Sequence, residues 1–89
     1  MKILLVEDEV TLGEYIKKGL TEAGFLVDHK LNGLDGYHAL MSETYNVIIM
    51  DVMLPDISGF ELVKNYRAAG HITPVLFLTA KDDLEDLIK

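Results

Sequence analysis

The chain has 89 residues, 49% of them hydrophobic, which suits one small globular domain and excludes an intrinsically disordered chain. Eight Lys and Arg residues stand against fifteen Asp and Glu, and the formal net charge of −7 argues against nucleic-acid binding by this chain alone. The sequence has no cysteine and no apolar run of membrane-spanning length, so we exclude disulfides and thiolate zinc sites and expect a cytoplasmic protein with no membrane partner.

Hydrophobic periodicity predicts strands and helices in strict alternation. The short apolar runs typical of strands are residues 3–6, 25–27, 47–50 and 74–78. The segments with apolar residues at helical spacing are residues 12–23, 34–41, 58–70 and 82–88. Gly24 and Gly70 mark two helix ends, and Ser58 followed by Glu61 is a capping-box pattern at a helix start.

Strands that alternate with helices imply parallel pairing through right-handed crossovers. The first, third and fourth predicted strands are apolar on both faces, as expected when helices cover a parallel sheet on both sides. We therefore predict an α/β fold with an open, doubly wound parallel sheet of the flavodoxin-like type. Its strand order is 2-1-3-4, without a fifth strand.

Acidic side chains follow two of the predicted strands. Glu7 and Asp8 come after the first strand and Asp51 after the third, and these strands are neighbours in the predicted order. Ligands bind such sheets outside the carboxyl ends of the strands, so we expect the three carboxylates to meet in one crevice. Clustered carboxylates repel one another and favour a cation, and oxygen ligands suit Mg²⁺. An ionised Asp51 could then act as a nucleophile on phosphorus, while the hydroxyl of Thr79 binds a phosphoryl oxygen.

Thr79 and several acidic residues near these strand ends also have a purely structural explanation. Asp8 or Glu9 could cap the following helix, Asp56 fits the turn after Pro55, and Thr79 is a β-branched residue suited to a strand. The convergence of acid, acid and hydroxyl at three strand ends favours the functional explanation over capping alone.

Three segments of the sequence resemble the receiver domain of bacterial two-component response regulators. They are "ILLVEDE" at residues 3–9, "DVMLPDISGFEL" at 51–62 and "PVLFLTAKD" at 74–82, and together they span almost the whole chain. The Leu-Pro after Asp51 and the Thr-Ala-Lys at the fourth strand resemble the OmpR/PhoB-type subgroup. The segments "GEYIKKGLTEAGF" and "NGLDGYHAL" are similar to heavy-metal, copper-type members.

The resemblance implies a CheY-like regulatory protein, not an enzyme, that accepts a phosphoryl group from a sensor histidine kinase and uses Mg²⁺. The implied roles are phosphoacceptor for Asp51, metal ligands for Glu7, Asp8, Asp51 and the backbone carbonyl of Met53, switch hydroxyl for Thr79 and phosphate-binding amide for Ala80. Asp8 would bind the metal directly and Glu7 more through water. Control of DNA would need an output domain that this chain does not contain.

The family also has an essential lysine and an aromatic switch residue on a fifth strand, which the chain does not reach before Lys89. Lys81 lies just after the Thr79-Ala80 pair, but we expect it to belong to a loop and not to replace that lysine. Residues 1–89 are therefore expected to be the N-terminal part of a receiver domain, truncated before the fifth strand and slow in phosphotransfer.

The predicted fourth strand, residues 75–78, is apolar on both faces and carries no charge that would protect a sheet edge. We therefore expect self-association, most simply as a homodimer in which these strands or the terminal helices pack together or are exchanged.

Four other interpretations stay open. A phosphatase of the haloacid dehalogenase type would need an acid where this chain has Met53, and a flavodoxin would need a phosphate loop after the first strand. A copper site could use the residues His29, His38, His71, Met50 and Met53, although the histidines lie on separate segments and Met50 belongs to a predicted buried strand. The fragment could also act only as a folding or dimerisation module.

Overall fold

The computed structural model describes residues 1–78 of the chain. Its helices and strands in chain order are β1 (Lys2–Val6), α1 (Val10–Glu22), β2 (Leu26–Lys30), α2 (Gly33–Ser42), β3 (Val47–Asp51), α3 (Gly59–Ala68) and β4 (Val75–Leu78). The predicted alternation is confirmed as far as the fourth strand. The predicted last helix, residues 82–88, lies outside the described residues.

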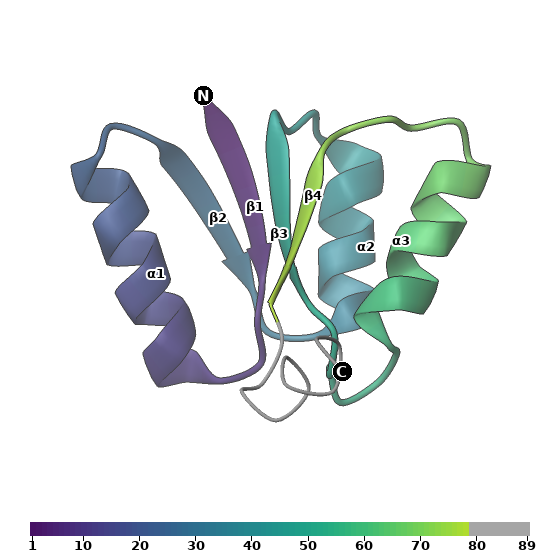
Figure 1. Ribbon diagram of the computed structural model, residues 1–89, viewed down its shortest axis with the longest axis horizontal. Helices are drawn as coiled ribbons and strands as arrows, with labels where there is room; N and C mark the ends of the chain where they lie inside the picture. The colour runs from purple at the N-terminus through teal and green to yellow at the C-terminus, as the bar shows by residue number, and fades with distance from the viewer. Residues whose placement is uncertain (79–89) are drawn as a thin grey trace, which may run out of the picture.

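The four strands form one parallel sheet in the order β2-β1-β3-β4, which confirms the predicted fold class and strand order. At the centre of the sheet Ile3 pairs with Val47, and Val6 pairs with Met50. Figure 1 shows α1 on one side of the sheet and α2 and α3 on the other. Because all strands run the same way, β1 and β3 end side by side at one edge, which we call the carboxyl edge.

The hydrophobic core is divided between the two faces of the sheet. The buried strand residues on the side of α2 and α3 are Leu4, Val6, Ile48 and Met50. Those on the side of α1 are Ile3, Leu5 and Ile49. Alternate residues of one strand therefore enter different clusters, which explains why β1 and β3 are continuous apolar runs.

The ends of the helices follow the local sequence signals. Gly24 and Gly70 lie just beyond α1 and α3 with φ angles of 98° and 96°, a left-handed conformation that glycine adopts without steric penalty. The side chain of Asn32 caps the first turn of α2, and the Ser58 hydroxyl accepts a hydrogen bond from the Phe60 amide at 3.2 Å. Local signals therefore mark the starts of α2 and α3 and the ends of α1 and α3.

The second strand differs from its prediction, residues 25–27. β2 covers Leu26–Lys30, and Phe25 precedes it and packs into the cluster on the α1 side. The extra residues Asp28, His29 and Lys30 are polar and gave no apolar signal. They fit because β2 is an edge strand of the sheet, where polar side chains can reach partners and also discourage pairing with another strand.

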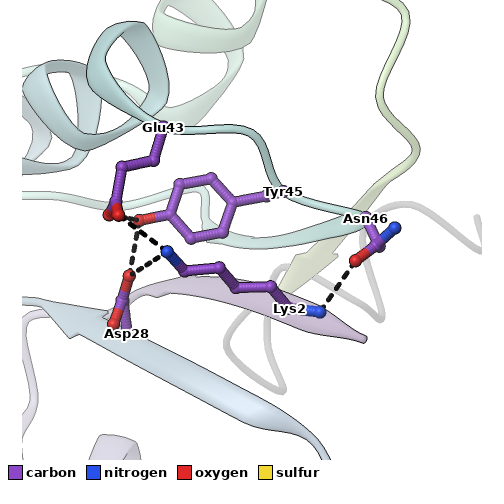
Figure 2. A network of polar contacts seen from close by, with 5 residues as sticks. All are labelled: Lys2, Asp28, Glu43, Tyr45 and Asn46. Carbon is purple, nitrogen blue, oxygen red and sulfur yellow. Dashed lines mark hydrogen bonds and ion pairs between the residues drawn. The ribbon is translucent and has the colours of Figure 1, made fainter.

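A polar network joins the start of β1 to β2 and to the end of α2 (Figure 2). The buried hydroxyl of Tyr45 lies 2.7 Å from a carboxylate oxygen of Asp28 and 3.1 Å from one of Glu43, and the Lys2 ammonium donates to Glu43 at 2.7 Å. Asn46 accepts from the Lys2 amide. The hydrogen bond from Tyr45 lowers the pKa of Asp28, and burial together with that carboxylate raises the pKa of Tyr45.

The other edge strand, β4, is apolar as predicted. The side chains of Leu76 and Phe77 are 62% and 39% exposed, and the Phe77 ring lies 4.7 Å from that of Phe60 on α3. The expected homodimer stays a prediction, because contacts within one chain do not test it. None of the helices in residues 1–78 is long and apolar enough to cross a membrane.

Candidate functional site

Three carboxylates come together at the carboxyl edge of the sheet. Glu7 and Asp8 follow β1 directly, and Asp51 is the last residue of β3. One oxygen from each lies within 4.8 Å of the others, which is the grouping expected from the strand order. Among residues 1–78 this is the single group of three or more acidic, histidine or cysteine side chains that could hold a metal ion, so the three histidines do not form a copper site there.

The three carboxylates differ in burial. Glu7 is 4% exposed, Asp51 is half-buried and Asp8 is exposed. Oxygen Oε2 of Glu7 is fully buried and has no hydrogen-bond partner. Burial, followed by the hydrogen bond with Asp51 and the negative charges of Asp51 and Asp8, raises the pKa of Glu7 to about 8. A cation at this position would offer the missing partner of Oε2 and reduce the repulsion among the acids, so the site fits a hard divalent ion.

The raised pKa of Glu7 predicts a pH-dependent stability for the metal-free protein. Its ordinary value of 4.5 applies to the unfolded chain, which therefore loses its proton at lower pH than the folded protein. The free energy of unfolding should fall as the pH rises from 4.5 to about 8. Glu7→Gln removes this contribution. The free energy of unfolding of the variant minus that of the parent should therefore increase by at least about 1.4 kcal/mol, the equivalent of one pKa unit, from pH 5 to pH 8.

Urea unfolding in the presence of a chelator measures this difference. Glu22→Gln at the exposed end of α1 is the matched control and should follow the parent at both pH values. Equal pH profiles for Glu7→Gln and the parent would contradict the assigned cause, and added Mg²⁺ should stabilise the parent most at the higher pH.

Asp51 is held by the loop between β3 and α3. Its Oδ1 accepts a hydrogen bond from the Met53 amide at 3.0 Å, and the Val52 amide donates to the Leu78 carbonyl at 3.1 Å. Met53 also forms an isolated antiparallel bridge with Ser58. Met53 is 62% exposed and lines the cleft beside the acids, and the role expected for its backbone carbonyl stays a prediction.

Gly59, the first residue of α3, lies directly against the backbone of Asp51. A Cβ atom added at Gly59 would overlap the Asp51 carbonyl oxygen and lie 2.9 Å from its carbonyl carbon. The Gly59 amide donates to the Val52 carbonyl at 2.9 Å. The loop can therefore fold back onto the end of β3 only because residue 59 has no side chain. Gly59 belongs to the segment "DVMLPDISGFEL", but no local pattern in that segment indicates this role.

The structural explanations for the neighbouring acids have separate outcomes. Glu9 occupies the cap position of α1 but makes no side-chain capping bond. Asp56 is more than a turn residue, because its carboxylate accepts from the amides of Gly33 at 2.7 Å and Leu34 at 2.9 Å. These two bonds lower its pKa and fix the start of α2 to the loop after β3. No local pattern could reveal this contact, because Gly33 and Leu34 precede Asp56 by 23 and 22 residues in the sequence.

The three acids open into a cleft with a volume of about 440 Å³. Its lining residues are Glu7, Asp8, Glu9, Leu12, Asp51, Met53 and Leu78. Leu78 brings the end of β4 to the cleft. Thr79 and Ala80, expected to bind the phosphoryl group, and Lys81 lie outside the described residues. In the described part the cleft can therefore hold a cation and a small anionic group bound to it.

Known proteins similar to this chain belong to the family that its sequence motifs resemble. Residues 3–89 match the model of the response regulator receiver domain. SilR of Salmonella typhimurium, a probable transcriptional regulatory protein, is 53% identical over 89 residues, which are all of this chain and 39% of SilR. The chain thus spans about two fifths of the length of this relative.

Two solved structures have the same fold. The response regulator TrrA of Thermotoga maritima, in complex with Mg²⁺ and BeF, has a TM-score of 0.87 and 30% identity over 96% of this chain and 74% of its own. A complex of TrrA with the histidine kinase ThkA has a TM-score of 0.82 and 33% identity over 89% of this chain and 68% of the matched chain. With its acids grouped at the carboxyl edge and its family match running from residue 3 to residue 89, this chain belongs to the response regulator receiver domain family.

Proposed function

We propose that Asp51 accepts a phosphoryl group while Mg²⁺ is held by Glu7, Asp8, Asp51 and the backbone carbonyl of Met53. The observation that carries the proposal is the group of three carboxylates with oxygens within 4.8 Å, one of which has a buried oxygen without a partner. Bound Mg²⁺ would balance the negative charge of these acids and of the phosphoryl oxygens.

Asp51 is the acid best placed to react. It is half-buried at a strand end, and the Met53 amide fixes one of its oxygens, so its orientation is defined by the backbone. In the transfer, a carboxylate oxygen of Asp51 forms a bond to phosphorus, and the bond between phosphorus and the donor breaks with its electron pair passing to the leaving group. For a histidine donor the leaving group is the imidazole. Thr79 and the Ala80 amide are proposed to bind the phosphoryl oxygens.

The proposed physiological donor is a sensor histidine kinase, and the proposed output is control of transcription through a DNA-binding domain outside this chain. The names of the curated relative, a transcriptional regulatory protein, and of the TrrA–ThkA complex support these two proposals. SilR is named a probable transcriptional regulatory protein, which agrees with the proposed OmpR/PhoB-type assignment and the proposed cytoplasmic location of this chain. The charge of −7 agrees with DNA binding by a separate domain.

The acidic cluster predicts how Mg²⁺ affinity responds to Asp8. Asp8→Ala removes a proposed ligand and leaves the buried Glu7 and Asp51 with only part of their repulsion relieved. The dissociation constant for Mg²⁺ should therefore rise at least tenfold, about 1.4 kcal/mol. Calorimetric titration with Mg²⁺ measures it, and Glu22→Ala at the far end of α1 should bind as the parent does.

Incubation with acetyl phosphate and Mg²⁺, followed by intact mass, tests the function itself. The expected result after a long incubation is a gain of one phosphoryl group that needs Mg²⁺, and the gain should be slow because residues 1–89 do not include the family's phosphate-binding lysine. A folded protein that binds Mg²⁺ and gains no phosphoryl group from acetyl phosphate or from a kinase would favour the folding or dimerisation module instead.

A further inference from the structure

His29 contacts the main chain of the acidic cluster, although it lies outside the three segments that resemble the receiver domain. It lies on β2, where it pairs with Leu5 of β1, and its Nε2 is 2.9 Å from the backbone carbonyl oxygen of Glu7. A carbonyl oxygen can only accept a hydrogen bond, so Nε2 carries the proton and donates it. His29 is therefore bonded to the main chain of the residue that begins the acidic pair.

The contact completes the attachment of Glu7 to β2. The Glu7 amide donates to the Lys30 carbonyl at 3.0 Å, which continues the ladder between β1 and β2 by one residue. The Glu7 carbonyl has His29 as its partner on that strand. Both polar groups of the Glu7 main chain are thus held by the end of β2, and the chain leaves the sheet toward Asp8 from a fixed point.

The edge of the His29 ring that carries Nε2 also lies against α1. Gly13 is buried in the first turns of this helix, and a Cβ atom added to it would overlap Cε1 and Nε2 of His29. The Gly13 amide donates to the Glu9 carbonyl at 2.9 Å, so the same turn also holds the end of the acidic loop. The imidazole therefore contacts both Gly13 and the Glu7 carbonyl, so β2 holds residue 7 and the first turn of α1 holds residue 9.

We propose that His29 is a positioning residue for the metal site, and that Gly13 provides the space its ring needs. By holding the Glu7 carbonyl, His29 sets where the side chains of Glu7 and Asp8 stand relative to Asp51, 4.8 Å or less away. The inference rests on the proposed Mg²⁺ function. Groups that orient metal ligands without touching the metal commonly change its affinity by 10- to 100-fold.

Two substitutions separate the hydrogen bond from the packing. His29→Leu keeps an apolar side chain of similar reach without a donor, and the Mg²⁺ dissociation constant should rise about tenfold. His29→Gln can place its amide nitrogen near the position of Nε2 and should restore most of the affinity. His38→Leu on the exposed side of α2 is the control and should bind Mg²⁺ as the parent does.

A second pair of variants tests the space at Gly13. Gly13→Ala should weaken Mg²⁺ binding in the parent, because the methyl group displaces the imidazole. In a His29→Ala background the same change should have little further effect, since the ring is gone. Equal effects of Gly13→Ala in both backgrounds would show that its role is independent of His29.

Amide hydrogen exchange of residues 8–13 provides a readout that does not depend on the metal. It should be faster in His29→Leu than in the parent and near the parent rate in His29→Gln. A parent that binds no Mg²⁺ would refute the proposed function, yet this exchange pattern would still support the positioning role. If His29→Leu and His29→Gln match each other in both Mg²⁺ affinity and exchange, whether unchanged or equally impaired, the positioning role is wrong.

Discussion

Asp51→Asn is expected to abolish phosphorylation by acetyl phosphate in the presence of Mg²⁺. An amide has no anionic oxygen with which to attack phosphorus, and the substitution also removes one negative charge from the metal site. The backbone around residue 51 should persist, because an Asn side-chain oxygen can still accept from the Met53 amide, as Oδ1 does in the parent at 3.0 Å. Intact mass after incubation is the measurement, with circular dichroism to confirm folding.

Asp56→Asn is the matched control, because Asp56 lies in the same loop and undergoes the same chemical change. Its carboxylate is already bonded to the amides of Gly33 and Leu34 and points to the start of α2. We expect this variant to be labelled like the parent. Stoichiometric labelling of Asp51→Asn would place the phosphoacceptor elsewhere. Loss of labelling in Asp56→Asn would do so only where circular dichroism and Mg²⁺ binding match the parent, because the Asn side chain keeps one of the two accepting oxygens.

The fold was predictable from the sequence where burial and periodicity agree. β1 and β3 are covered on both faces, so each appears as an uninterrupted apolar run, and the helix ends carry Gly24 and Gly70 as explicit stop signals. β2 was predicted too short because it is an edge strand whose last residues are polar. Hydropathy cannot distinguish such residues from a loop until their partners are known.

The candidate site was predictable in part, for a topological reason. Strand order alone brings Glu7, Asp8 and Asp51 to one edge, so no side-chain information was needed to group them. The unequal burial of the acids depends on how the loop after β1 packs, which is not encoded in any short motif. The contacts of Asp56 and His29 join segments more than twenty residues apart, and only the folded chain reveals them.

Gly59→Ala is expected to be strongly destabilising and to impair phosphorylation. The new methyl group would overlap the Asp51 carbonyl oxygen, a backbone atom that cannot rotate away as the end of a side chain can. Either α3 moves away from β3, which breaks the 2.9 Å bond between the Gly59 amide and the Val52 carbonyl, or the end of β3 shifts and carries the Asp51 side chain with it. Overpacking of this kind lowers the free energy of unfolding by about 1–3 kcal/mol.

Gly19→Ala is the matched control for this prediction. Gly19 lies inside α1, and a Cβ atom there meets nothing within 4 Å, so the same substitution adds no clash and removes a flexible residue from a helix. It should raise the free energy of unfolding by about 0.5–1 kcal/mol and leave phosphorylation unchanged. Urea unfolding and acetyl phosphate labelling of the two variants decide the matter. If Gly59→Ala is as stable and as readily labelled as Gly19→Ala, the close approach of α3 to Asp51 does not constrain the site.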